Sequence, residues 1–346
     1  MALGWDLLHN LVKPRWDWLQ VEVTTFCNAA CLYCPRTAYG DRRPDRHLPL
    51  AAFRKLLPFF KKTKLAHLQG WGEPLLHPDF FTMAALAKDA GCRVGTTSNG
   101  MLLDPVKIRQ TVALGLDFIA LSLAGGSAPV HDHFRRGTSF HQILEVLDSF
   151  RRIKADLGSL TPEIHIAYLL LRPGWPDLER LPLVLEGFGV REVVISTLDF
   201  VPAGALSGEE VTAEGWGDYE EMRVRLQMVA AAGAARGLQI RHNLRPPGAG
   251  GPACTENPGR GLVVAADGGV SPCVFANLPP GISRFAGGRE LSYQPLIFGN
   301  INRDSLEDIW HTKNYAAFRE GFRAGKVPAH CRACAKISVP GAKAGG

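Results

Sequence analysis

Apolar stretches of strand length alternate with longer segments of helical periodicity over the first two hundred residues. Strands are expected at 19–25, 65–69, 93–97, 118–123, 163–171 and 192–198. Helical patterns are expected at 50–61, 78–90, 105–114, 139–154 and 177–188. Because strands that alternate with helices form a parallel sheet covered by helices, this pattern predicts an α/β fold. The six units are two short of a closed eight-stranded barrel, so we predict an open, partial (β/α)6 TIM-type barrel.

The pattern changes after a further helical segment at 218–236. The Gly- and Pro-rich stretch 248–252 interrupts it. A hairpin is then expected from strands 261–265 and 270–273 around the turn Asp267-Gly268, and helices at 305–310 and 315–323. We therefore predict an N-terminal extension over residues 1–17, the barrel over 18–240 and a small second domain over 241–346.

The composition is that of an ordinary globular protein. Of 346 residues, 46% are hydrophobic and 21% are charged, and no apolar run approaches the roughly 18 residues of a membrane span. Residues 1–18 lack the apolar core of a signal peptide. The net charge of +6 comes from scattered Lys and Arg with little aromatic interleaving. We therefore expect a cytoplasmic protein that binds neither membrane nor nucleic acid.

Three of the eight cysteines directly follow the first predicted strand. Cys27, Cys31 and Cys34 have the spacing C-x3-C-x2-C, so a strand that runs into a tight loop can place three thiolates around one metal centre. Structural zinc sites use four closed ligands. Three cysteines on a cubane iron–sulfur cluster instead leave one iron free to bind another molecule. The spacing therefore favours an iron–sulfur site with one open position.

A second motif lies where the second predicted strand ends, in Gly70-Trp71-Gly72-Glu73-Pro74. Barrel enzymes place their working groups at the carboxyl ends of the strands. Glycine lets a backbone approach a ligand closely, so we expect this segment to contact a ligand. The cysteine loop and this segment together resemble the radical S-adenosylmethionine (radical SAM) superfamily.

The resemblance implies a 4Fe–4S cluster held by Cys27, Cys31 and Cys34, whose free iron binds the methionyl end of SAM. It implies that Glu73 holds the SAM amino group and that Arg135 pairs with the SAM carboxylate, a task suited to a guanidinium group. His131 and His133 beside this arginine are expected to face solvent. The other residues expected at SAM or in its motif are Tyr33, Gln69, Gly70, Gly72, Asn99 and Ser122.

Four further cysteines lie in the last hundred residues. Cys254 and Cys273 form the pattern C-x13-G-x4-C across the predicted hairpin, and Cys331 and Cys334 follow near the end. This set resembles the twitch form of the SPASM extension, which implies that the four cysteines hold one auxiliary 4Fe–4S cluster. A four-cysteine structural zinc site is the alternative. The fold expected for the whole chain is a partial barrel followed by a small twitch/SPASM-like iron–sulfur domain.

The resemblance also implies an activity. A reduced N-terminal cluster would cleave SAM to a 5′-deoxyadenosyl radical that abstracts hydrogen from a substrate, and the auxiliary cluster would accept an electron. A ferredoxin or flavodoxin is the expected electron donor. The substrate is expected to be a peptide, a protein or a small molecule, since similar enzymes include maturases of tungsten-cofactor oxidoreductases and biosynthetic alcohol dehydrogenases. The residues before Asp17 are too few for a separate peptide-recognition domain. The alternatives outside enzymes are a zinc-binding protein and an electron carrier.

Oxidation of a substrate radical also requires a base near the radical carbon. The two-residue alternation of a strand places His67 on the same face as Gln69, toward the barrel interior. Asp199 follows the sixth predicted strand. We expect one of these two residues to take the proton. The structural alternatives are that His67 only forms an interior hydrogen bond and that Asp199 caps the following loop.

Overall fold

The chain folds around one large sheet. In the computed structural model, residues 15–202, 204–206, 208–211, 216–244, 254–286, 289–332, 334 and 336–337 are described. The sheet has ten strands in the order β12-β9-β8-β1-β2-β3-β4-β5-β6-β7. Its strands are β1 (Trp16–Val21), β2 (Thr63–Leu68), β3 (Arg93–Ser98), β4 (Phe118–Leu123), β5 (Glu163–Leu170), β6 (Val190–Thr197), β7 (Gln239–His242), β8 (Gly261–Val264), β9 (Gly269–Ser271) and β12 (Gly299–Asn300).

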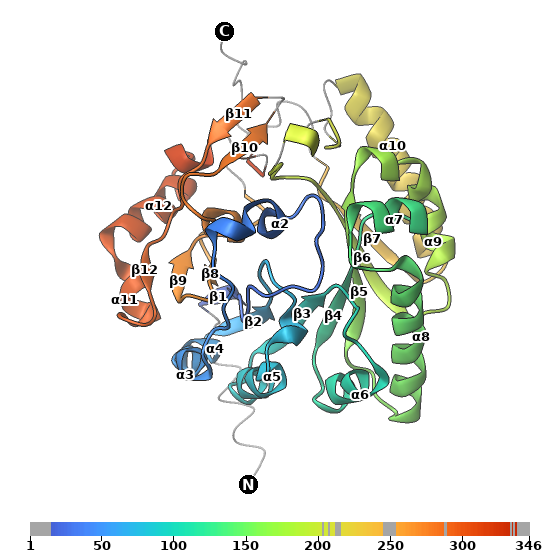
Figure 1. The fold of residues 1–346 in the computed structure, drawn as a ribbon, viewed down its shortest axis with the longest axis horizontal. Coiled ribbons are helices and arrows are strands. Elements are labelled where there is room, and N and C mark those ends of the chain that lie inside the picture. Colours follow the sequence, from blue (N-terminus) through green and yellow to red (C-terminus); the bar gives the residue numbers. More distant parts are fainter. Residues whose placement is uncertain are drawn as a thin grey trace.

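Helices cover the outer face of this sheet (Figure 1). Between the strands of the barrel lie α2 (Pro35–Tyr39), α3 (Leu50–Arg54), α4 (Leu57–Phe60), α5 (Phe80–Asp89), α6 (Pro105–Ala113), α7 (Ala128–Phe134), α8 (Phe140–Asp156), α9 (Leu181–Val184) and α10 (Trp216–Ala234). The C-terminal part adds the hairpin β10 (Ser283–Ala286) and β11 (Arg289–Ser292) and the helices α11 (Leu306–His311) and α12 (Lys313–Arg323). No helix in the described part of the chain is both long and apolar enough to cross a membrane.

Local sequence accounts for these elements. In β5, Ile164, Ile166 and Tyr168 are buried against the helices, while the residues between them face the barrel interior. Helix α8 begins at the N-cap Ser139, whose hydroxyl accepts a hydrogen bond from the Gln142 N–H. Its buried residues recur at helical spacing and cover the sheet. The predicted strand 118–123 is confirmed as β4.

Two predicted helices are each divided. The segment 50–61 forms α3 and α4, with Pro58 in the first turn of the second helix. The segment 177–188 forms a 3-10 turn over 176–180 followed by α9, with Pro182 in its first turn. Proline has no N–H to donate and its ring crowds the preceding turn, so each helix restarts at the proline.

The sheet extends beyond the six predicted strands. β7 follows α10 and pairs in parallel with β6, and it spans position 240, where the sequence suggested a boundary. β8 pairs in parallel with β1, with Trp18 opposite Gly261 and Val21 opposite Val264. The predicted hairpin of β8 and β9 is confirmed, but it is continuous with the barrel sheet. The Gly- and Pro-rich stretch 248–252 lies outside the described residues.

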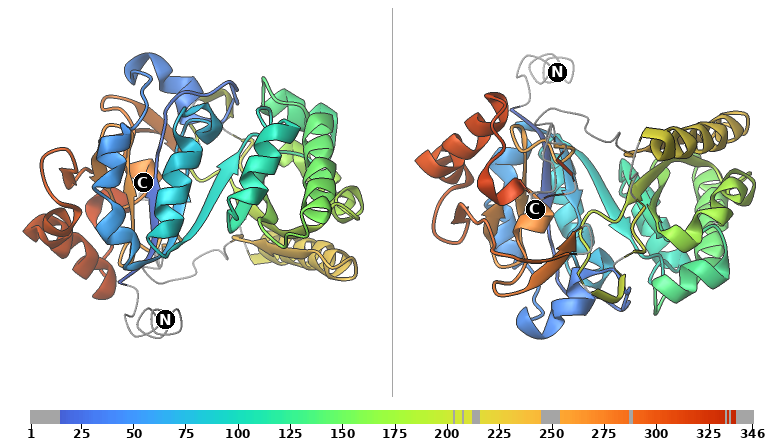
Figure 2. Two further views of the ribbon diagram at one scale, coloured as in Figure 1. Left: turned by 90° about the horizontal axis from the view of Figure 1, so that it is seen from below. Right: turned by 90° about the horizontal axis from the view of Figure 1, so that it is seen from above.

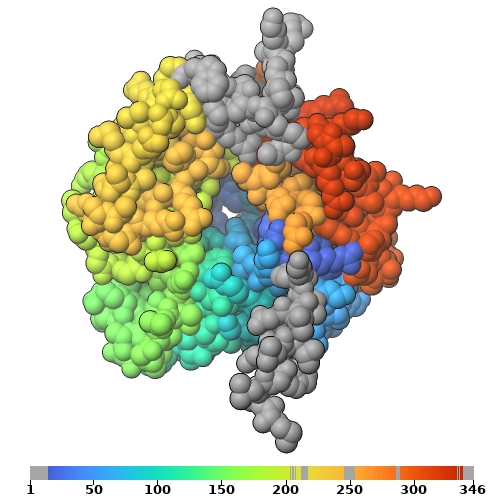
Figure 3. All heavy atoms as spheres, turned by 180° about the vertical axis from the view of Figure 1, so that it is seen from behind, coloured from blue at the N-terminus to red at the C-terminus, as the bar shows by residue number. Residues whose placement is uncertain are grey.

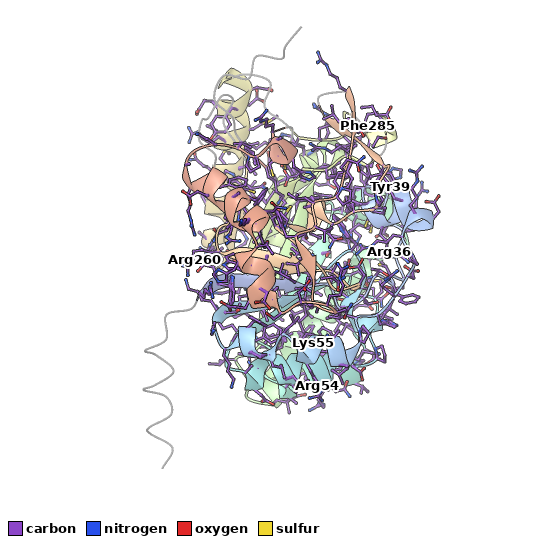
Figure 4. All side chains as sticks on the ribbon, turned by 90° about the vertical axis from the view of Figure 1, so that its left-hand side faces the viewer. Arg36, Tyr39, Arg54, Lys55, Arg260 and Phe285 are labelled. Carbon is purple, nitrogen blue, oxygen red and sulfur yellow. The ribbon has the colours of Figure 1, made fainter. Side chains whose placement is uncertain are left out.

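The C-terminal elements therefore stand beside the first ones. Views from below and above show the orange and red elements next to the blue ones (Figure 2). Seen from behind, the molecule is hollowed at its centre between the yellow and the orange parts of the chain (Figure 3). Tyr39 of α2 and Phe285 of β10 lie close together on one side (Figure 4). The Tyr39 hydroxyl lies within hydrogen-bond distance of the carbonyls of Pro202 and Ser283, to either of which it can donate, and so links the region after the cysteine loop to the C-terminal part.

Candidate active site

The cysteine loop is held by backbone hydrogen bonds to the last residue of α7 and to the segment that follows it. The Ala30 N–H donates to the Arg136 carbonyl at 2.7 Å, and the Leu32 N–H donates to the Phe134 carbonyl at 2.9 Å. Within the loop, the Cys34 N–H donates to the Cys31 carbonyl at 3.1 Å. These bonds place Arg135 directly beside the loop.

A cavity of about 330 Å³ lies at the carboxyl ends of the strands. Cys27, Cys31 and Cys34 line it, as does Asp199. All the residues that the sequence suggested for SAM also line it: Tyr33, Gln69, Gly70, Gly72, Glu73, Asn99, Ser122 and Arg135. His67 is not among the residues that line this cavity. The structure therefore brings together all but one of the residues predicted at the N-terminal site.

Glu73 is buried in this cavity, with 2% of its surface exposed. The Ser98 hydroxyl donates to its Oε1 at 2.8 Å, and the Asn99 N–H donates to its Oε2 at 2.7 Å. The Leu75 N–H also donates to Oε1, at 3.3 Å. A carboxylate has about four acceptor positions, so one remains for a ligand. Burial raises the pKa of Glu73, and its hydrogen bonds oppose this shift.

Asn99 connects this carboxylate to the cysteine loop. Its Nδ2 donates to Asn28 Oδ1 at 2.8 Å and lies 4.0 Å from Cys27 Sγ. Its Oδ1 accepts the Met101 N–H at 2.9 Å. Because its side chain contacts the cysteine loop and its N–H binds Glu73, Asn99 fixes the loop relative to the ends of β2 and β3.

The two glycines of the 70–74 segment are required by protein packing. A Cβ on Gly70 would lie 2.1 Å from Glu22 Cγ, and one on Gly72 would lie 2.3 Å from the Thr24 carbonyl oxygen. No larger residue fits at either position. The expectation that glycine serves approach to a ligand is therefore incomplete, because the glycines first allow the segment to pack against the end of β1.

Glu22 is a structural residue that the sequence analysis missed. It is 2% exposed. Its Oε1 accepts the Trp71 N–H at 3.0 Å, its Oε2 accepts the Ala266 N–H at 3.1 Å, and Arg43 pairs with both oxygens. It thus joins the 70–74 segment to the C-terminal hairpin. The available signal was a charged residue between the apolar Val21 and Val23.

Arg135 is 7% exposed and donates to the Tyr33 hydroxyl. Its Nε is buried and without a partner among the described residues. A buried guanidinium group that borders a cavity and has an unpaired nitrogen suits an anionic group such as a carboxylate. His131, expected to face solvent, is fully buried: its Nδ1 accepts the Ala124 N–H at 3.3 Å and its Nε2 lies 3.0 Å from Thr138 Oγ1. Burial lowers the pKa of His131 to about 3, because α7 turns this ring inward.

The predicted bases occupy different environments. Asp199 accepts from the Thr197 hydroxyl at 3.2 Å and pairs with Lys336 at 3.3 Å. His67 Nε2 lies 3.1 Å from Thr97 Oγ1, and its ring faces Phe118. Burial lowers the pKa of His67 to about 4, so this ring is neutral at pH 7. His67 therefore has the interior hydrogen bond that was the alternative to a role as the base.

A second cavity, of about 320 Å³, lies next to the first. Cys273, Cys331 and Cys334 line it. Cys254 forms a β-bridge with Ile337 and interacts electrostatically with Cys334. Cys254, Cys273, Cys331 and Cys334 thus gather from three separate segments.

The donor sets fit iron–sulfur clusters. Burial raises the pKa of Cys34 and Cys331 to about 12, that of Cys254 to about 11, and also that of Cys273. Such thiols form thiolates only when a cation compensates their charge, as iron does. Among the residues that the structure describes, no three His, Cys, Asp or Glu side chains are placed to hold a single metal ion. Cys27, Cys31 and Cys34 border the first cavity, and three of the four C-terminal cysteines border the second.

Lys336 was also missed by the sequence analysis. Its Nζ lies 2.6 Å from Glu256 Oε1 and 3.3 Å from Asp199 Oδ2. Burial opposes its charge, but the two carboxylates hold the pKa of Lys336 above its usual value. The ion pair joins the last described residues to the end of β6. A lysine near the C-terminus has no pattern that could have revealed these partners.

Comparison with known proteins gives two family matches. Residues 21–162 match the radical SAM superfamily, and residues 254–335 match SPASM, an iron–sulfur cluster-binding domain. The second match favours an iron–sulfur cluster over the zinc site that spacing had left open.

Similar proteins agree with these matches. The chain is 25% identical over 313 residues to a tungsten-containing aldehyde ferredoxin oxidoreductase cofactor-modifying protein of Pyrococcus furiosus, covering 87% of this chain and 83% of that one. It is 26% identical to a PqqA peptide cyclase of Ruegeria pomeroyi, covering 92% and 79%.

Solved structures show the same fold. SuiB of Streptococcus suis bound to S-adenosylmethionine superposes with a TM-score of 0.65 at 13% identity, covering 90% of this chain and 69% of that one. The chain therefore belongs to the radical SAM superfamily and is an enzyme of its SPASM-containing group, which uses SAM and iron–sulfur clusters.

Proposed function

We propose that this enzyme is a maturase that removes hydrogen from a substrate bound in the first cavity and passes an electron toward the second. The observation that carries the proposal is the juxtaposition of the two cavities. The first contains Cys27, Cys31 and Cys34, and the second is bordered by three of the C-terminal cysteines. Asp199 borders both.

The residues of the first cavity form two groups, one that would bind SAM and one that would contact the substrate. When bound, the N-terminal cluster and SAM supply a 5′-deoxyadenosyl radical, and the C-terminal cluster supplies an electron acceptor. Glu73 has one acceptor position for the SAM amino group, and Arg135 has an unpaired Nε for the SAM carboxylate. Gln69, Asn99 and Ser122 complete the SAM side of the cavity.

The remaining wall is suited to the substrate. Leu198, Phe200 and Phe275 give it an apolar surface that excludes water. Asp199 is the carboxylate on this side, so we propose that it accepts the substrate proton at a carboxylate oxygen. Its pair with Lys336 holds the carboxylate at the boundary of the two cavities.

The substrate class follows from similarity over nearly the whole chain. The relative of Pyrococcus furiosus carries a name that describes modification of a tungsten-enzyme cofactor, and we propose a substrate of that kind, a cofactor or cofactor precursor of an oxidoreductase. A peptide substrate is the second candidate, because the PqqA peptide cyclase is similar over a comparable length.

A deuterium-transfer experiment tests the substrate class. The enzyme is incubated anaerobically with SAM, a reductant and one of two fractions from cells grown in D2O: the extracted tungsten-enzyme cofactor pool or the short-peptide pool. The fraction that contains the substrate is expected to transfer deuterium into 5′-deoxyadenosine, measured by mass spectrometry. Transfer from the peptide pool alone would replace the cofactor proposal with the peptide one. The triple variant Cys27→Ala/Cys31→Ala/Cys34→Ala is the matched control and should show none.

We further propose a cytoplasmic location and a one-electron carrier such as ferredoxin or flavodoxin as reductant. The support for the location is that none of the eight cysteines, all of which lie in the described part of the chain, forms a disulfide, as expected in a reducing compartment. The need for a carrier follows from the chemistry, because each reductive cleavage of SAM consumes one electron.

A further inference from the structure

One wall separates the two cavities. Asp199, Phe200 and Phe275 border both of them. The rings of Phe200 and Phe275 are stacked, with centroids 5.8 Å apart and planes 10° from parallel. These three residues therefore form a shared boundary of the two cavities.

A buried ion triad lies against the wall. Lys336 Nζ is 5.3 Å from the centroid of the Phe275 ring. Its carboxylate partners are Asp199 on the barrel side and Glu256 on the C-terminal side. The side chains of Lys336, Asp199 and Glu256 are only 14%, 10% and 16% exposed, so solvent screens their charges weakly.

Two members of the triad are also close in sequence to the C-terminal cysteines. Glu256 lies two residues after Cys254, and Lys336 lies two residues after Cys334. One fixed positive charge and one fixed negative charge are therefore held beside the same cysteine group. The reduction potential of an iron–sulfur cluster depends on nearby charge and on solvent exposure.

We propose that Lys336 sets the reduction potential of the C-terminal iron–sulfur cluster and that Glu256 opposes it. The proposal rests on the proposed function, in which this cluster accepts the substrate electron. Reduction adds one negative charge to the cluster, so a buried ammonium beside it favours the reduced form, and a buried carboxylate disfavours it. Lys336 would thus act on the reduction potential of the cluster and would not touch the reacting atoms.

The electron balance is simple. One electron would leave the substrate radical and one proton would leave the same substrate to a base, and a cluster held by Cys254, Cys273, Cys331 and Cys334 would supply the acceptor for the electron. A one-electron carrier protein of the class that supplies the first cluster then takes it up. The potential of the C-terminal cluster must lie above that of the substrate radical and within reach of the carrier, and a fixed charge adjusts it without changing the ligands.

Potentiometric titration of the holoenzyme, followed by electron paramagnetic resonance, tests this proposal without substrate. Lys336→Met, which keeps a side chain of similar length and removes the charge, is expected to lower the reduction potential of the C-terminal cluster. Glu256→Gln is expected to raise it. Lys336→Arg should retain a potential near that of the wild type. The N-terminal cluster, whose expected ligands Cys27, Cys31 and Cys34 line the first cavity and not the second, is the internal control and should change less in each variant.

Opposite signs for Lys336→Met and Glu256→Gln support the proposal, because loss of packing alone has no reason to produce them. If the two variants shift the potential in the same direction, or do not shift it at full iron content, the proposal is overturned. The triad would then have only a structural role. If Lys336→Met does not retain its iron, the Glu256→Gln variant decides alone: a higher potential supports the proposal, and an equal or lower one rejects it. Since no turnover is measured, failure here is distinguishable from failure of the proposed substrate oxidation.

Discussion

The two cysteine groups of this enzyme are built in different ways. Cys27, Cys31 and Cys34 lie within one short loop after β1, and they share their cavity with polar side chains that have unused hydrogen-bonding positions. The C-terminal cysteines are gathered from a bridge at Cys254, the end of the β8–β9 hairpin, and the segment at Cys331 and Cys334. A local loop can present an open site, whereas a site assembled from distant segments also fixes the fold of its own region.

Removal of the first group should have the largest effect. The variant Cys27→Ala/Cys31→Ala/Cys34→Ala is expected to lose all cleavage of SAM while retaining about four of about eight iron atoms per chain. Iron analysis and chromatography of 5′-deoxyadenosine measure the two quantities. A variant with no iron at all would show that the two sites do not form independently.

Removal of the second group should affect the fold as well. Cys331→Ala/Cys334→Ala is expected to lower the melting temperature of the holoenzyme, because metal binding at a distributed site contributes directly to folding. SAM cleavage should continue in part, while oxidised product is lost. The triple variant at the first site is the matched comparison, and an equal fall in its melting temperature would remove the contrast between the sites.

Variants of Asp199 and His67 distinguish an effect on proton transfer from an effect on SAM cleavage. Asp199→Asn is expected to lower product formation by about 10²- to 10⁴-fold, the usual contribution of a positioned base, while 5′-deoxyadenosine still forms. His67→Asn should change neither quantity greatly, since His67 does not border the cavity. If both products fall together in Asp199→Asn, the carboxylate is needed for structure and is not the base.

Arg135 and Arg136 test the SAM side of the open site. Arg135→Ala should weaken SAM binding by about ten- to a hundred-fold, which corresponds to about 1.5–3 kcal/mol for a charged hydrogen bond. Arg136→Ala, at an exposed neighbouring position, should leave it unchanged. Calorimetric titration with SAM under anaerobic conditions measures both affinities. If only Arg136→Ala loses affinity for SAM, then Arg136 and not Arg135 contacts the SAM carboxylate.

The smallest expected effect is on the pH dependence of stability, through His67 in the barrel interior. The pKa of His67 is about 4 in the folded protein and 6.5 in its ordinary state. The unfolded chain therefore binds a proton first, and the free energy of unfolding should fall as pH drops from 6.5 to 4. His67→Asn should flatten this part of the melting-temperature profile, whereas His133→Asn, at an exposed position, should not. An unchanged profile in His67→Asn would show that His67 contributes little to the acid sensitivity.

Much of the site could be predicted from sequence because its residues follow strand ends. The position of Glu73 after β2 and of Asn99 after β3 is set by neighbouring parallel strands, and the cysteine spacing is local. Glu22 and Lys336 could not be identified, because their partners come from segments far away in the chain. The inward turn of His131 was missed for a related reason, since one turn of helix α7 decides whether its ring meets Ala124 or solvent.

The pairing of β8 with β1 has a consequence for biosynthesis. β1 leaves the ribosome early, but the strand that covers its free edge is made only when residues 261–264 emerge. Until then a growing chain carries an exposed strand edge, which is a template for aggregation. The carboxylate of Glu22, which follows β1, also waits for the Ala266 N–H before its partners are complete. The contact that joins the end of β1 and the 70–74 segment to the C-terminal hairpin therefore forms only after residue 266 has emerged, whereas the hydrogen-bond partners of the cysteine loop at residues 134 and 136 are made earlier.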